Sequence, residues 1–278
     1  MKQEPVTAKI LEFFVTNRCT LNCKMCLCSV PYLPHPRHTP KEELFRHFAL
    51  AFPLYDSIGR VEIIGGEPLM HPHIAEIIEV LIQYREKIPK IRITTNATIV
   101  PGEKLLAAVH KAQEAGIAFD FLLDNYGPLS RNLEKIQRLL EEHRIDYRVD
   151  QYTGGNQRGN GWLCYGDFTL HEGETEQELW EKFQHCLCPK LEFHDTHEGK
   201  IYSCVYAMTG VALGKFQLAP NEYVDLTDST ASDEEKREIL RTFLKRPTTA
   251  CRYCDSFLEC SPRFPAAEQL PRREEAPC

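Results

Sequence analysis

The stretch Cys19-Thr-Leu-Asn-Cys23-Lys-Met-Cys26 places three cysteines in the spacing C-x₃-C-x₂-C, directly after an apolar run that predicts a strand. Three thiolates at this spacing fit three corners of a [4Fe–4S] cube and leave its fourth iron without a protein ligand. A structural metal site closes its coordination, whereas a site that does chemistry keeps one position open. The stretch therefore predicts an enzyme that presents one bare iron to a small molecule.

Structural zinc is the alternative for these three cysteines. A zinc site usually joins a C-x₂-C pair to a second pair of ligands. Here the fourth ligand would have to be Cys28 or His35, which fits that pattern poorly. The spacing therefore favours the iron–sulfur cluster.

The first half of the chain alternates short apolar runs with longer segments of helical period. This alternation predicts an α/β fold of parallel βαβ units, whose ligands gather at the carboxyl ends of the strands. After residue 150 the alternation breaks at a glycine-rich polar stretch, so we expect one domain at 1–155 and a linker with a second domain at 156–278. The predicted strands are 10–15, 61–64, 91–95, 118–123 and 147–149.

Composition limits the class of protein. At 278 residues the chain is long enough for one large domain and an appendage. A net charge of −7 and a pI near 5.9 argue against a nucleic-acid partner. The N-terminus shows no signal-peptide core and no apolar run is long enough to span a membrane, so we expect a cytoplasmic protein with no membrane partner. The twelve cysteines are then expected to be metal ligands or free thiols rather than disulfides.

Two further motifs stand at the ends of predicted strands: Gly65-Gly66-Glu67-Pro68 and Thr94-Thr95-Asn96. With the cysteine stretch, and in this order, they resemble the radical S-adenosylmethionine (radical SAM) superfamily over roughly residues 8–150. The resemblance implies a partial (β/α) barrel of about five to six parallel strands. It implies that SAM chelates the open iron through its amino and carboxylate groups, and that reductive cleavage yields a 5′-deoxyadenosyl radical. Met25 departs from the family pattern, in which the third cysteine often follows an aromatic residue.

The resemblance also assigns cofactor contacts at these strand ends. The Gly-Gly-Glu turn is expected to hold the methionyl amine, since glycine lets the backbone approach a ligand closely. Arg148 is predicted to orient the substrate, because a guanidinium holds its donors in a rigid fork. A solvated or structural role is the alternative for Asp124 and Arg148. The expected cofactor-binding residues are Gly65, Gly66, Glu67, Thr95, Asn96 and Asp124.

Two cysteines match no ligand pattern. Cys164 is a candidate catalytic residue that would donate a hydrogen atom to a product radical, and Cys28 is a second candidate for that role. An inert buried thiol is the alternative for both.

A second cysteine group occupies the end of the chain. The arrangement C-x₁₀-G-x₄-C, with a hairpin turn at Gly199, followed by C-x₂-C-x₅-C, resembles the SPASM and twitch extensions that bind auxiliary iron–sulfur clusters. Phe264 stands where a full SPASM domain would have another cysteine, so one [4Fe–4S] cluster is expected. Cys186 in place of Cys188, a second cluster completed by Cys260 and Cys278, and a zinc ribbon are the alternatives. The expected ligands are Cys188, Cys204, Cys251 and Cys254.

The combined pattern predicts an oxidoreductase that cleaves SAM and abstracts hydrogen from a small hydroxylated substrate, a sugar or aminocyclitol. An electron donor such as flavodoxin or ferredoxin is the expected protein partner. The given sequence leaves no residues at either end for a separate leader-peptide-binding domain, which favours a small molecule over a peptide. The alternatives are epimerisation or cross-linking of a ribosomal peptide, and a redox sensor without turnover.

Overall fold

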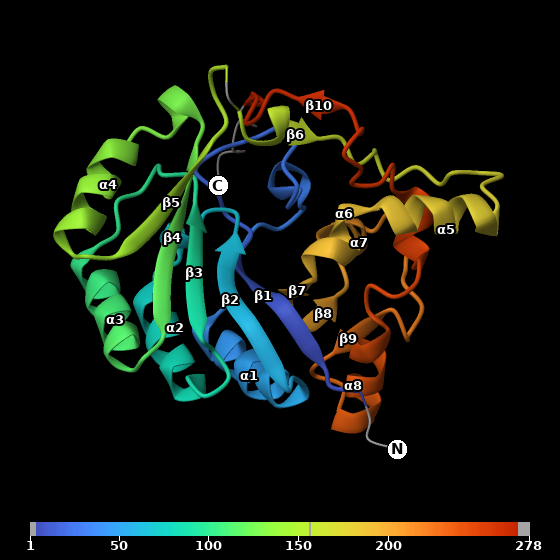
Figure 1. Cartoon of the computed structure of the whole chain (residues 1–278), viewed down its shortest axis with the longest axis horizontal. Coiled ribbons are helices and arrows are strands. Elements are labelled where there is room, and N and C mark those ends of the chain that lie inside the picture. Colours follow the sequence, from blue (N-terminus) through green and yellow to red (C-terminus); the bar gives the residue numbers. More distant parts are fainter. Residues whose placement is uncertain (1–3, 156, 272–278) are drawn as a thin grey trace.

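The computed structural model describes residues 4–155 and 157–271, and a large, mostly parallel sheet is its main feature (Figure 1). The strand order is β5-β4-β3-β2-β1-β7-β8-β9, with β1 to β5 and β7 parallel and β8 and β9 antiparallel to their neighbours. The five strands expected from the sequence are therefore confirmed. The strands are β1 (Thr7–Thr16), β2 (Ser57–Gly65), β3 (Lys90–Thr95), β4 (Ala118–Asn125), β5 (Asp146–Gln151), β7 (Phe193–His197), β8 (Lys200–Tyr202) and β9 (Tyr223–Asp225).

Helices cover the outer face of this sheet. Alternate strand residues such as Leu11, Phe13 and Ile63 point to that side and are fully buried in the main apolar core. Fully burying a side chain of that size contributes roughly 1.5–3 kcal/mol, so this layer dominates the stability of the fold. Figure 1 shows on this side α1 (Lys41–Ala51), α2 (Ile74–Leu81), α3 (Glu103–Glu114) and α4 (Leu133–Glu142).

The inner face of the sheet is polar. Because side chains alternate along a strand, the residues between the apolar ones point away from the helices. Strand register places Glu12, Glu62, Arg92 and Asp120 in one row across β1 to β4. Strands of a parallel sheet that are buried on both faces normally read as continuous apolar runs. The row is therefore a polar layer, in which buried Glu62 pairs with Arg60 and buried Arg92 pairs with Asp120.

The sixth parallel strand comes from the second half of the chain. The hairpin predicted at Gly199 is confirmed: β7 and β8 pair antiparallel, and the turn residues Glu198 and Gly199 both have positive φ, 48° and 75°. Such a turn matches the twist of its two strands. β7 pairs with β1, so the sheet itself continues past residue 155. The predicted domain boundary stays a prediction.

The remaining elements lie beside the sheet and over the carboxyl edge of its parallel strands (Figure 1). A short antiparallel pair, β6 (Trp162–Leu163) and β10 (Arg263–Phe264), lies over that edge. No helix in residues 4–155 and 157–271 is both long and apolar enough to cross a membrane. The later helices are α5 (Glu176–His185), α6 (Leu187–Leu191), α7 (Val205–Ala212) and α8 (Asp233–Thr242).

Candidate active site

The loop that follows β1 carries Cys19, Cys23 and Cys26 at the carboxyl edge of the sheet. Cys23 is buried, and the other two are partly exposed. Two side chains reach these sulfurs: Asn96 Nδ2 lies 3.5 Å from Cys19 Sγ, and Gln269 Nε2 lies 3.2 Å from Cys23 Sγ. Burial raises the pKa of both thiols to about 12, so each needs such donors or a metal to be held as a thiolate. Thiolates are the ligands that iron–sulfur clusters use, and this donor set fits one.

The Gly-Gly-Glu turn packs directly on that loop. Gly66 N donates to Thr16 O at 2.8 Å, and Glu67 N donates to Arg18 O at 2.9 Å. A Cβ added at Gly66 would lie 2.2 Å from Arg18 O and 3.1 Å from Cys19 Cβ. Glycine is therefore required here by the close approach of the cysteine loop.

Replacing Gly66 by alanine is expected to displace the cysteine loop, because the new methyl group would overlap the Arg18 carbonyl oxygen. Overpacking of this kind costs about 1–3 kcal/mol. We expect a lower iron content after anaerobic reconstitution, measured per chain. Gly155→Ala is the matched control, because nothing lies within 4 Å of the Cβ it would add. Equal iron content in both variants would contradict the expectation.

The Glu67 carboxylate joins the ends of β2 and β3. It is fully buried and accepts hydrogen bonds from Leu69 N, Thr95 Oγ1 and Asn96 N at 2.8–3.0 Å. Burial raises its pKa to about 7, although these donors favour the charged form. The structure thus brings Glu67, Thr95 and Asn96 together with Cys19, as expected from the order of the motifs.

Asp124 lies at the end of β4 beside an aromatic group that we did not predict. Tyr126 Oη donates to Asp124 Oδ2 at 3.1 Å, and the Tyr126 ring stacks on Tyr152 and meets Trp162 edge-on. Burial raises the pKa of Asp124 to about 7. Isolated aromatic residues carry no motif: the pairing of β4 with β5 brings Tyr126 and Tyr152 together, and β6 supplies Trp162.

The Asp124 pKa predicts a pH effect on stability. The ordinary value is 3.8 and the folded value about 7, so the folded protein binds the extra proton between those pH values. Stability from this group is complete below about pH 4 and is lost as pH rises to about 7. This loss should be absent in Asp124→Asn. The melting temperature of the variant minus that of wild type should therefore be larger at pH 8 than at pH 5. Exposed Asp146→Asn is the control, and a parallel pH profile in both variants would contradict this expectation.

The predicted catalytic residues Arg148 and Cys164 come from different elements of the fold. Arg148 is on β5, where its guanidinium is half exposed and donates to the buried Asp150 carboxylate at 3.1 Å; Arg158 also pairs with Asp150. Cys164 follows β6, and its backbone N–H donates to Pro262 O at 2.9 Å. Both roles stay predictions.

A pair of carboxylates lies further down the inner face. Glu12 on β1 faces Asp195 on β7, and Asp195 Oδ2 is buried without a hydrogen-bond partner among the described residues. Burial raises the pKa of Asp195 to about 6, and burial together with the Asp195 charge raises that of Glu12. The interruption of the apolar run by Glu12 was visible in the sequence, but its partner was not.

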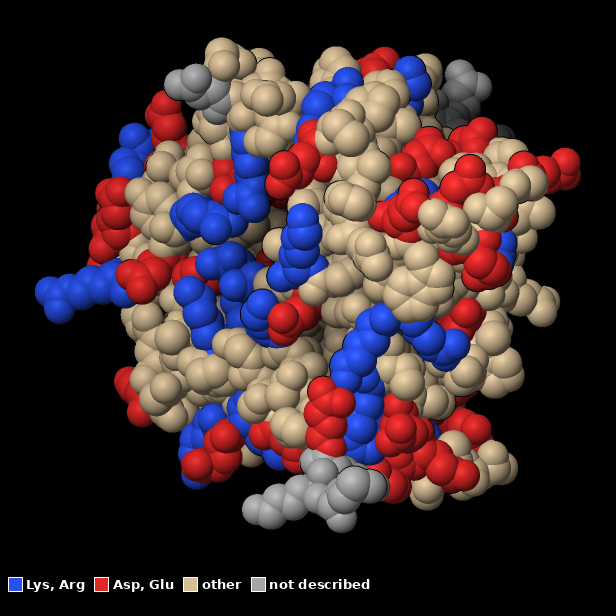
Figure 2. All heavy atoms as spheres, turned by 45° about the vertical axis from the view of Figure 1, so that its right-hand side comes forward, with Lys and Arg blue, Asp and Glu red and all other residues tan. Residues whose placement is uncertain are grey.

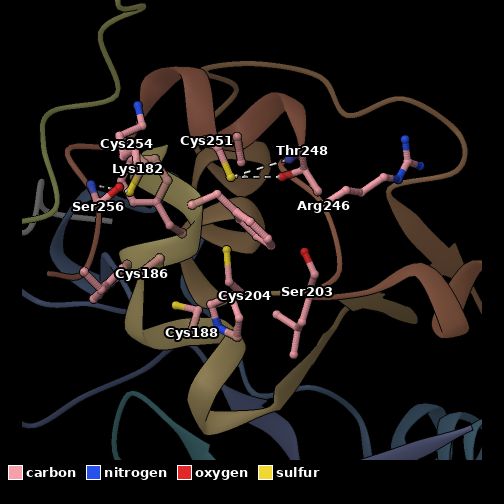
Figure 3. A pocket seen from close by; sticks show the side chains of 16 residues that line it. Lys182, Cys186, Cys188, Ser203, Cys204, Arg246, Thr248, Cys251, Cys254 and Ser256 are labelled. Carbon is pink, nitrogen blue, oxygen red and sulfur yellow. Dashed lines mark hydrogen bonds between the residues drawn. The ribbon is translucent and has the colours of Figure 1, made fainter. Parts of the chain in front are cut away.

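Five cysteines of the second group line one cavity (Figure 3): Cys186, Cys188, Cys204, Cys251 and Cys254. Cys188 lies on α6, Cys204 caps the N-terminus of α7, and Cys251 and Cys254 lie in and just after the short turn of helix at Thr249–Tyr253. Cys186 also lines this cavity, so the choice between Cys186 and Cys188 stays open.

Backbone amides already point at three of these sulfurs. Ala207 N lies 3.4 Å from Cys204 Sγ, Thr248 N 3.5 Å from Cys251 Sγ, and Ser256 N 3.2 Å from Cys254 Sγ. Hydrogen bonds to cysteine sulfurs are a feature of iron–sulfur sites and help to set their potential. The donor set therefore fits a cluster.

Several observations concern the alternative ligands and the zinc alternative for the two cysteine groups. In residues 4–155 and 157–271, no three His, Cys, Asp or Glu side chains converge on a point where a single metal ion would bind. His35 and Cys260 are exposed. Cys278 lies outside the described residues.

This chain is similar to known proteins in sequence and in fold. The Radical SAM superfamily pattern matches residues 13–185. A GTP 3′,8-cyclase of Sulfurovum sp. (strain NBC37-1) is 28% identical over 125 residues, 44% of this chain and 36% of that protein. A GTP 3′,8-cyclase of Listeria welshimeri is 39% identical over 89 residues, 31% of this chain and 26% of that protein. The chain thus spans little more than a third, at most, of the length of these relatives.

Among solved structures, BtrN in complex with AdoMet and 2-DOIA has a TM-score of 0.55 against this chain. The match covers 92% of this chain and 97% of BtrN at 13% sequence identity, which shows a shared fold. Members of the matched family are enzymes, and the family implies a [4Fe–4S] cluster and SAM. Because the family pattern covers more than half of its residues, this chain belongs to the radical SAM superfamily.

Proposed function

We propose that this protein abstracts a hydrogen atom from a carbinol carbon of a small hydroxylated substrate, a sugar or aminocyclitol, and oxidises that alcohol. In this proposal Cys19, Cys23 and Cys26 hold the cluster that binds SAM. When bound, cluster and SAM supply a 5′-deoxyadenosyl radical. The Gly65-Gly66-Glu67 turn, Thr95, Asn96 and Asp124 contact SAM or place the groups that do.

The charge pattern of the inner face is the main support for the proposed class of substrate. Its cations are paired with carboxylates: Arg60 with Glu62, Lys90 and Arg92 with Asp120, and Arg148 and Arg158 with Asp150. Figure 2 shows Lys and Arg side chains gathered round a hollow in the surface, with acidic side chains among them. Paired charges offer many hydrogen-bond donors and acceptors without a strong net field. That surface suits a polyhydroxylated ligand.

The second thiol group supports oxidation as the outcome. Abstraction of hydrogen from the carbinol carbon leaves a substrate radical. Loss of its hydroxyl proton makes it a strong reductant, and its conversion to the carbonyl releases one electron. An auxiliary [4Fe–4S] cluster held by Cys188, Cys204, Cys251 and Cys254 would supply the acceptor for that electron. The fold shared with BtrN, which was solved with AdoMet and 2-DOIA, also favours this class.

A deuterium-transfer experiment tests the proposal. A candidate sugar or aminocyclitol alcohol, deuterated at the reacting carbon, should pass its label to 5′-deoxyadenosine, and one SAM should be consumed per carbonyl formed. The unlabelled alcohol is the matched control. Label drawn instead from a peptide carbon would overturn the substrate class in favour of peptide modification. Failure to cleave SAM under strong reductant would favour the redox sensor.

A further inference from the structure

The segment 267–271, which we call the C-terminal strap, lies along the cysteine loop that follows β1. Lys24 N donates to Glu268 O and Leu270 N donates to Asn22 O, both at 2.8 Å, and Cys23 forms a β-bridge with Gln269. Ala267 at the start of the strap is buried. The strap is thus docked by backbone hydrogen bonds on both sides of Cys23.

The Gln269 side chain is oriented by this docking. Asn22 N donates to Gln269 Oε1 at 2.8 Å, which identifies the oxygen end of the amide. The Nε2 end then points at Cys23 Sγ at 3.2 Å and also donates to Ala267 O at 2.8 Å. Both ends of the amide have partners, so the donor toward the sulfur is held in place.

We propose that Gln269 is a positioning residue that raises the reduction potential of the cluster held by Cys19, Cys23 and Cys26. The inference rests on the proposed ligand set. Hydrogen bonds to the sulfurs are among the factors that set the potential of an iron–sulfur cluster. An N–H dipole aimed at a cysteine sulfur favours the reduced cluster, which carries one more negative charge. Gln269 therefore makes reduction of the cluster, which SAM cleavage requires, more favourable.

Three variants separate the amide donor from the docking of the strap. Gln269→Leu removes the donor. Gln269→Glu keeps an acceptor for Asn22 N but removes the donor and adds negative charge beside Cys23. Glu268→Ala is the matched control, because it removes the exposed ion pair between Glu268 and Lys24 and touches no sulfur.

The measurement is a redox titration of the reconstituted full chain, followed by electron paramagnetic resonance. The signal that changes when SAM is added identifies the cluster with the open iron. We expect Gln269→Leu to lower the equilibrium constant for reduction by about tenfold, which is about 59 mV for a one-electron couple. Gln269→Glu should lower it further, and Glu268→Ala should match wild type. A stronger reductant should restore SAM cleavage by both Gln269 variants.

The outcomes are distinct. An unchanged potential in both Gln269 variants overturns the inference, and so does an equal fall in Glu268→Ala, because docking alone would then explain the effect. If Gln269→Leu does not load iron, Gln269→Glu still decides the question, since it retains the contact with Asn22. A wild-type chain that forms no SAM-responsive cluster overturns the proposed ligand set first, and this inference with it.

Discussion

Simultaneous replacement of Cys19, Cys23 and Cys26 by alanine is expected to reduce 5′-deoxyadenosine formation to background. The three thiols are the proposed ligands of the SAM-binding cluster, and without them no iron is held at the carboxyl edge of the sheet. About eight irons per chain are expected in the reconstituted wild type, four for each of two [4Fe–4S] clusters. The triple variant should retain about four, because the second thiol group lies in a separate cavity.

Cys28→Ala is the matched control for this variant, because Cys28 lies in the same loop but outside the C-x₃-C-x₂-C spacing. It should retain all the iron and cleave SAM. Loss of the metal in Cys28→Ala would favour a four-ligand site such as zinc. SAM cleavage by the triple variant under strong reductant would refute the assignment of the three cysteines.

The second large effect is expected from replacing Cys251 and Cys254 together by alanine. This double variant should lose about four irons per chain, since two of four proposed ligands of the auxiliary cluster are removed. It should still cleave SAM, because Cys19, Cys23 and Cys26 are unchanged. Oxidation of the substrate should fall to background, since the electron released by the substrate radical would lack its acceptor. Iron analysis, 5′-deoxyadenosine and carbonyl product are measured on the same preparation.

Cys260→Ala is the control here. Cys260 is exposed and does not line the cavity that holds the other thiols. It should leave iron content and turnover unchanged. Loss of iron from Cys260→Ala would favour a second auxiliary cluster, and zinc in the wild type in place of the second four irons would favour the zinc ribbon.

Local pattern was enough to predict the scaffold and the first cysteine loop. The three cysteines lie within eight residues, so their spacing alone limits which metal site they fit. The strands β1 to β5 were predicted because apolar periodicity is a property of neighbouring residues. The β7–β8 hairpin was predicted for the same reason, since its turn needs the positive φ of Gly199.

Other features depend on contacts between distant segments. The partner of Glu12 is Asp195, which reaches it only because β7 pairs with β1. Arg148 was chosen from its place on a strand, but its pairing with Asp150 and its half-exposed position depend on how β5 packs at the sheet edge. The aromatic group of Tyr126, Tyr152 and Trp162 also comes from three separate elements.

The sequence by itself predicted a metal-binding role for the cysteine loop and determined the alternation of strands and helices, because spacing and period are set within a few residues. Tertiary structure alone decided which segments outside the sequence motifs contact that loop. Gln269 lies 246 positions from Cys23 and stands in no motif, yet its amide reaches the Cys23 sulfur. That contact depends on packing of the whole chain. Many weak interactions between distant segments together hold the C-terminal strap in place, and they cannot be predicted from a pattern of neighbouring residues.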